Sequence, residues 1–127
     1  MNEEKTNKIL RFEDMPVWQD SLDLAVLIYK TTKSFPAQER FALTNQLRRA
    51  SSSVSANIAE GFGRQTLKDR AHFYHIALGS LLETKNFIYL AQKLEYVKTD
   101  EADDIISKID SVHKQITAIL GYFKKHV

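Results

Sequence analysis

Residues 46–64 decide the fold of this chain, and they read QLRRASSSVSANIAEGFGR. Apolar residues recur in and just before this stretch at the three- and four-residue spacing of one helical face: Leu43, Leu47, Ala50, Val54, Ile58. Serine and alanine flank this face, and such small side chains allow a second helix to approach closely. Serine is a mediocre helix former, so the predicted helix depends on tertiary contacts. Gly61 and Gly63 are expected to stop it.

The preceding chain predicts another amphipathic helix, which begins beside Pro16. Proline is tolerated in the first turn of a helix, and the acids just before it suit the helix dipole. The residues that form one face of this helix are Trp18, Ser21, Leu22, Ala25, Ile28, Tyr29 and Thr32. The helix should end before Pro36, since a residue that precedes proline avoids helical geometry. The next helix is expected to begin close to Pro36 and Gln38.

Two further helices are predicted after residue 64. Thr66 and Asp69 have the order of a capping box at a helix start. The apolar side of that helix is broad enough to suggest a central helix or an oligomer contact: Phe73, Tyr74, Ala77, Leu78, Leu81, Leu82, Ile88, Tyr89. Thr99 or Asp100 is expected to cap the last helix. Its stripe is the cleanest in the chain: Ala102, Ile105, Ile106, Ile109, Val112, Ile116, Ile119, Leu120, Phe123.

Four helices of roughly 20 residues with short connections predict an all-α protein, an antiparallel up-down-up-down four-helix bundle. No strand pattern competes with the helical periodicity. Residues 13–127 are expected to form the bundle, and residues 1–12 a flexible N-terminal arm.

Composition narrows the class of protein further. The chain has 127 residues, a net charge of +2 and no cysteine, so disulfides and thiolate metal sites are excluded. The sequence has no apolar run long enough for a membrane span and no signal peptide, so a cytoplasmic location is expected. Residues 40–70 contain six cations and two carboxylates, whereas residues 100–110 are acidic. This asymmetry indicates either a binding face or ordinary solvated helices.

Several motifs together resemble one known family. They are Phe12-Glu13-Asp14, Val17-Trp18-Gln19, Gln46-Leu47-Arg48-Arg49-Ala50, Ser53-Val54-Ser55-Ala56-Asn57-Ile58-Ala59-Glu60-Gly61-Phe62-Gly63 and Ala77-Leu78-Gly79-Ser80-Leu81-Leu82-Glu83. The chain resembles the four-helix-bundle proteins encoded in intervening sequences of bacterial large-subunit ribosomal RNA genes. More distantly, it is similar to the accessory variability proteins of diversity-generating retroelements. The resemblance implies a homopentameric ring and, from the retroelement proteins, a basic surface that engages RNA.

Five basic residues are the candidate nucleic-acid contacts: Arg48, Arg49, Arg64, Lys68, Arg70. Arg48 and Arg49 are adjacent and so point about 100° apart on a helix. At least one is expected to contact phosphate, whose oxygens match the guanidinium fork; the alternative is a structural ion pair. The other three surround a predicted helix start, where anions are favoured. A solvated basic loop is the alternative there.

A structural motif is predicted where the helix of residues 46–64 ends. Asn57 and Glu60 are expected to form a hydrogen-bonded junction that shapes the loop through Gly61 and Gly63. A carboxylate in the last turn of a helix is mildly unfavourable, so Glu60 needs a cationic partner, either Arg64 or an arginine of another helix.

No catalytic constellation appears in the sequence, and no cofactor is expected. His72 and His75 have the spacing of two metal ligands on one helix, but nothing completes the set, so surface or interface histidines are favoured over a metal site. We therefore expect a non-enzymatic, homo-oligomeric nucleic-acid-binding or scaffold protein, with RNA favoured and no membrane partner. The alternative is a protein-interaction module that docks a partner protein through its helical surface.

Overall fold

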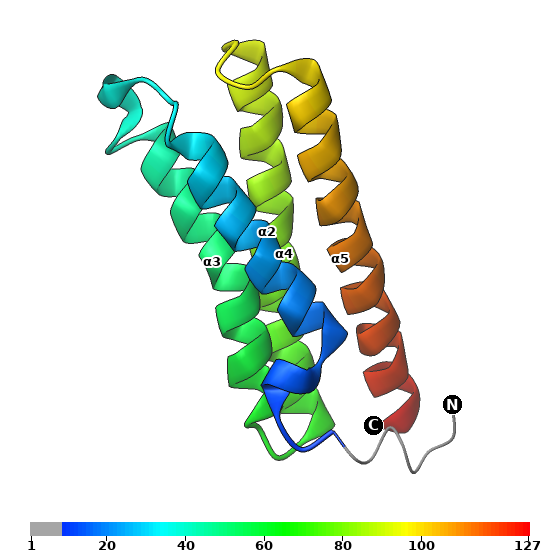
Figure 1. Ribbon diagram of the computed structural model, residues 1–127. Helices are drawn as coiled ribbons and strands as arrows, with labels where there is room; N and C mark the ends of the chain where they lie inside the picture. The colour runs from blue at the N-terminus through cyan, green and yellow to red at the C-terminus, as the bar shows by residue number, and fades with distance from the viewer. Residues whose placement is uncertain (1–8) are drawn as a thin grey trace.

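The computed structural model describes residues 9–127, which form a bundle of four long helices (Figure 1). The helices are α2 (Pro16–Thr32), α3 (Leu43–Phe62), α4 (Leu67–Lys93) and α5 (Thr99–His126), and two short 3-10 turns, η1 (Phe12–Asp14) and η2 (Ala37–Glu39), precede α2 and α3. Consecutive helices run in opposite directions (Figure 1). The prediction of an all-α, antiparallel up-down-up-down bundle is confirmed, and no strand occurs within residues 9–127.

The N-terminal part of the described chain packs against α2. Most of the expected arm, residues 1–8, lies outside the described residues. Phe12 begins η1, and its ring packs edge-on against Trp18 at 5.1 Å between centroids. The packed part of the chain thus includes Phe12.

Two of the predicted helix starts agree with the structure. Pro16 is the first residue of α2, where its missing N–H costs no intrahelical hydrogen bond. Thr66 is the N-cap of α4, and its hydroxyl accepts a hydrogen bond from the Asp69 backbone N–H at 3.1 Å. In both cases the signal is local in the sequence, which is why pattern alone located it.

The predicted start of the second long helix was wrong. α3 begins at Leu43, because Ala42 has a non-helical backbone (φ −123°, ψ −107°). The residues after Pro36 form only the single turn η2. The Glu39 carboxylate then accepts a hydrogen bond from the Leu43 backbone N–H at 3.3 Å. A side chain from η2 therefore caps α3 in place of a continuous helix.

The predicted N-cap of the last helix, Thr99 or Asp100, was also wrong, because the observed N-cap lies one residue before Thr99. Lys98 is the N-cap of α5 and makes no side-chain cap hydrogen bond, while Thr99 is already helical. Asp100 accepts instead from the neighbouring Glu101 backbone N–H at 2.9 Å. The acids of the first turn still favour the positive end of the helix dipole.

The two glycines near the end of α3 have different roles from the paired stop that was predicted. Gly61 is still inside α3, and Gly63 caps it in a right-handed conformation (φ −78°). A Cβ on Gly61 would lie 3.0 Å from the Phe73 Cβ and 3.4 Å from the Arg70 carbonyl oxygen. Gly61 is therefore required because α4 approaches α3 so closely at this level.

We expect Gly61→Ala to destabilise the bundle and Gly79→Ala to stabilise it. Alanine gains about 1 kcal/mol over glycine in a helix interior. At Gly61 this gain is outweighed, since overpacking costs about 1–3 kcal/mol and the Phe73 Cβ cannot move without moving the α4 backbone. At Gly79 a new Cβ would meet nothing within 4 Å. Urea unfolding of both variants measures the difference.

The same pair of variants tests whether Gly79 lies at a subunit contact. If it does, Gly79→Ala lowers the assembled mass in solution although the protomer itself is more stable. Equal stabilisation by both substitutions would contradict the close α3–α4 approach at Gly61.

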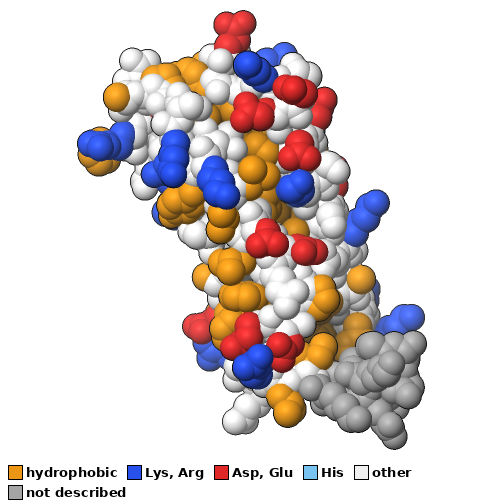
Figure 2. Space-filling model, viewed as in Figure 1, with side chains coloured by type: hydrophobic (Ala, Val, Ile, Leu, Met, Phe, Trp, Pro, Cys, Tyr) orange, Lys and Arg blue, Asp and Glu red, His pale blue; other side chains and the backbone are white. Residues whose placement is uncertain are grey.

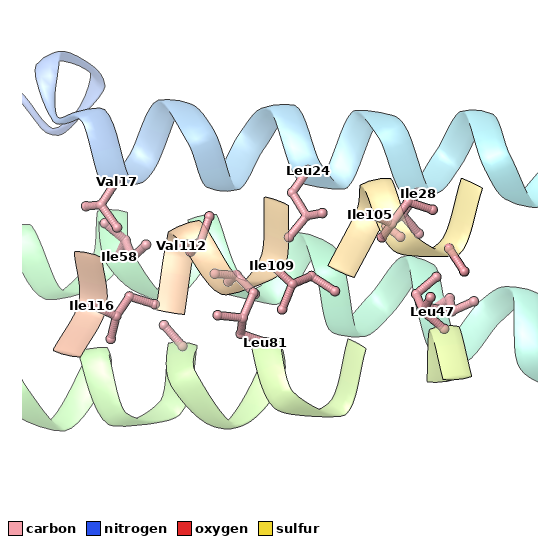
Figure 3. Close-up of a cluster of buried hydrophobic side chains, with 14 of the residues drawn as sticks. Val17, Leu24, Ile28, Leu47, Ile58, Leu81, Ile105, Ile109, Val112 and Ile116 are labelled. Atoms are coloured by element: carbon pink, nitrogen blue, oxygen red, sulfur yellow. The ribbon is translucent and has the colours of Figure 1, made fainter. Parts of the chain in front are cut away.

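The core runs along the axis of the bundle and receives side chains from all four long helices (Figure 3). Residues at its centre are fully buried: Leu24, Ile28, Leu47, Ile58, Leu81, Ile109, Ile116. All but Leu24 lie on the helical faces that the sequence predicts. The predicted α2 face was wrong in part, since Leu22 and Tyr29 are 40% and 44% exposed and Leu24 is buried in their place. Among residues 9–127, no helix combines the length and the apolar character that a membrane crossing requires.

Candidate nucleic-acid interface

The five predicted basic contacts do not form one patch. Arg48 and Arg49 lie in the first half of α3, whereas the other three surround the loop between α3 and α4. From Arg49 to the end of α3 at Phe62 the helix rises about 20 Å, at 1.5 Å per residue. The two groups therefore lie toward opposite ends of the bundle.

Arg48 links α3 to the end of α2. Its Nε donates to the Thr32 hydroxyl at 2.9 Å, and one terminal nitrogen donates to the Tyr29 carbonyl oxygen at 3.3 Å. The guanidinium lies over the Tyr29 ring, 4.8 Å from its centroid. The last carbonyls of a helix have no intrahelical donor, so Arg48 acts as a C-terminal cap for α2. Arg48 therefore has a structural role. It fulfils this role through hydrogen bonds and not through the structural ion pair that was the alternative to a phosphate contact.

Arg49 points in another direction and remains exposed. It donates to the Gln46 side chain at 2.6 Å and lies 3.9 Å from the Glu83 carboxylate on α4. With side chains 62% and 40% exposed, this ion pair contributes little to stability. The carboxylate nevertheless offsets the charge that Arg49 would offer a phosphate.

The cations around the α3–α4 loop are largely engaged within the loop. Arg64 lies 3.4 Å from the Glu60 carboxylate and 4.6 Å from the centroid of the Phe73 ring. Arg70 donates through Nε to the Arg64 carbonyl oxygen at 2.7 Å. Lys68 is exposed and has no ion-pair partner among the described residues. The predicted Glu60–Arg64 pair is thus present, and it reduces the net charge of the loop.

Asn57 differs from its predicted role in shaping this loop. Its side-chain amide donates to the Ser53 carbonyl oxygen at 2.8 Å and to the Ser53 hydroxyl at 2.9 Å. The Ser53 hydroxyl in turn is hydrogen-bonded to the Ser80 hydroxyl at 3.0 Å. Asn57 therefore supports the α3–α4 contact one turn before the loop, because its side chain points back along α3.

A cationic surface that was not predicted from the sequence lies where α2 ends and α3 begins. We call it the basic corner, and it consists of Lys30, Lys33, Arg40 and Arg48. Figure 2 shows Lys and Arg side chains gathered over this end of the molecule, beside hydrophobic ones. The first three are exposed, and Arg48 is half-buried. The sequence signal that could have indicated this surface is the pair Arg40-Phe41, which lies four residues after Pro36.

The carboxylate within the basic corner is engaged in internal hydrogen bonds. Glu39 accepts hydrogen bonds from the Leu43 backbone N–H and, at 2.8 Å, from the Tyr96 hydroxyl. The hydrogen bond to Glu39 raises the pKa of Tyr96. The Tyr96 ring also packs on buried Phe35, with 5.4 Å between centroids. Glu39 is thus committed to internal contacts that hold the corner in place.

The acidic segment lies at the same end of the bundle but over α5. Its exposed carboxylates occupy the first turns of that helix: Asp100, Glu101, Asp103, Asp104. Figure 2 shows acidic side chains on that side of the molecule and basic ones over α2 and α3. This end of the bundle therefore has a basic side and an acidic side. A polyanion is attracted to the first and repelled by the second.

The comparisons with known proteins identify one family. Residues 13–118 match the sequence model described as 23S rRNA-intervening sequence protein. The chain is also similar to a crystal structure of a protein of unknown function from the S23 ribosomal protein family of Bacteroides thetaiotaomicron VPI-5482. The TM-score is 0.74 at 28% identity, with 82% of this chain and 97% of that chain covered. No curated protein matches the chain.

Proposed function

The chain belongs to the 23S rRNA-intervening sequence protein family. We propose that it is a non-enzymatic, homo-oligomeric RNA-binding protein of the cytoplasm. The observation that carries the proposal is the basic corner. Three exposed cations and the half-buried Arg48 lie at the junction between α2 and α3, while the carboxylate of Glu39 is held by Tyr96 and by the start of α3. Phosphate oxygens are the natural ligands of such a cluster.

Assembly into a homo-oligomer would strengthen RNA binding. A single corner has few cations, but copies arranged in a ring bind one RNA with a higher effective concentration. The distant resemblance to the accessory variability proteins of retroelements supports a pentamer and an RNA ligand. Exposed apolar side chains along α4 offer a subunit contact, each 39–49% exposed: Ile76, Leu82, Tyr89, Leu90.

The test is the affinity of the purified protein for structured RNA across a salt series, with the assembled mass recorded in each buffer. We expect affinity to fall steeply with salt, since each phosphate contact contributes a slope of about −0.7 to −0.9 in log K against log[salt]. An intact oligomer that binds no RNA at low salt would contradict the proposal and leave the arginines with structural roles.

A second candidate function is docking of a partner protein. It is favoured by an apolar stripe on the outer side of α2, where Leu22, Val26 and Tyr29 are 40–46% exposed. Their spacing places them on one helical face. This function predicts a specific protein recovered at physiological salt after nuclease treatment, and loss of that protein from the Val26→Asp variant.

A further inference from the structure

We infer that Phe41 is a stacking surface for an unpaired RNA base, so that the basic corner recognises RNA loops in preference to duplex. This inference rests on the proposed RNA-binding function. Phe41 is 86% exposed, the most exposed large hydrophobic residue among those described. Exposure of a phenylalanine ring to water is unfavourable, and burial against a planar partner would lower the free energy.

The backbone on both sides of Phe41 is held in place, so the ring is presented from a defined position. Before Phe41, the Arg40 backbone N–H donates to the Ala37 carbonyl oxygen at 3.1 Å, and directly after it the Ala42 backbone N–H donates to the Glu39 carbonyl oxygen at 3.0 Å. The next residue, Leu43, is buried in the core, and its N–H donates to the Glu39 carboxylate. Preorganisation of this kind lowers the entropy cost of binding.

The surroundings of Phe41 fit a nucleotide better than an apolar protein surface. The Arg40 guanidinium lies 5.8 Å from the ring centroid, and Lys33 and Arg48 belong to the same corner. Protein docking sites usually present contiguous apolar patches, whereas this ring stands next to cations. Aromatic rings beside cations are the usual arrangement for single-stranded nucleic acid, with the base on the ring and phosphates on the cations.

The requirement for an unpaired base follows from RNA geometry. Bases inside an A-form duplex are stacked on one another and cannot be reached by a side chain in the deep, narrow major groove. Loops and bulges have bases that can swing out and stack on an aromatic ring. Phe41 therefore adds affinity only for RNA with unpaired bases, while the cations serve both kinds of RNA.

The experiment compares two RNA probes, a hairpin with an unpaired loop and a blunt duplex of the same stem. We expect Phe41→Ala to weaken hairpin binding about 10-fold, since stacking on one base is worth about 1–3 kcal/mol, and to leave duplex binding unchanged. Phe41→Trp should retain hairpin affinity. Tyr122→Ala is the control, because Tyr122 is a 48% exposed aromatic residue near the other end of the bundle.

Two results would overturn the inference while leaving the proposed function intact. One is a wild-type protein that binds RNA but whose Phe41→Ala variant binds hairpin equally well, or loses hairpin and duplex affinity alike. The other is a Phe41→Ala variant with a changed assembled mass, which would make Phe41 a subunit contact. A wild-type protein that binds neither probe defeats the proposed function itself, and this inference with it.

Discussion

Leu81→Asp is expected to abolish folding of the bundle. Leu81 lies on α4 with no exposed surface, among core residues contributed by the other long helices (Figure 3). An aspartate there has no cationic partner in the apolar core, and burying an unpaired carboxylate costs far more than a few kcal/mol. Domains of this size are stable by only about 5–15 kcal/mol. Far-UV circular dichroism at neutral pH should therefore show loss of the helical spectrum.

The matched control is Leu82→Asp, one residue further along α4. Leu82 is 44% exposed, so the carboxylate of an aspartate at this position stays in water and the protomer should remain folded. A helical, cooperatively melting Leu81→Asp protein would contradict the placement of α4 in the core. A change in assembled mass for Leu82→Asp alone would place a subunit contact on this side of α4.

The double substitution Lys33→Glu and Arg40→Glu is expected to weaken RNA binding by about 10- to 100-fold at low salt, and to reduce the salt slope by about 2. Both residues are exposed, and the structure shows no ion pair for either among residues 9–127. Thermal stability should therefore stay close to that of the wild type. Filter binding to structured RNA across a salt series measures the change in affinity.

The control for this variant is the double substitution Lys68→Glu and Lys124→Glu, which makes the same change in net charge near the other end of the bundle. Both lysines are exposed. Equal losses in the two double variants would mean that net charge alone governs binding. A larger loss in the control would move the RNA contact to the α3–α4 loop, where the sequence analysis placed three of its five candidate residues.

Arg48 illustrates why individual roles at the candidate site were not predictable. The helical period shows that Arg48 and Arg49 diverge, but it does not reveal what lies opposite each of them. The antiparallel return of the chain places the end of α2 beside Arg48, so this side chain caps Tyr29 and Thr32. Arg49 points toward α4 and Glu83. Two adjacent arginines thus have different structural roles because different parts of the fold lie opposite them.

The start of α3 shows the same limit for backbone structure. The residues after Pro36 have ordinary helical preferences, and no local signal marks the break at Ala42. The cap of α3 is Glu39, whose carboxylate is also held by Tyr96, 57 residues away in the chain. Long-range contacts of this kind override local propensity.

The number of helices, their order, the starts at Pro16 and Thr66 and most of the core stripes followed from the sequence, because periodicity and capping act over a few residues. Folding alone brought Arg48 of α3 beside the end of α2, where Lys30 and Lys33 lie, because the two helices meet only when the chain reverses. It also gave Gly61 its role, since the distance between α3 and α4 is a property of their packing. Local patterns specify elements, whereas surfaces and close approaches depend on which elements become neighbours.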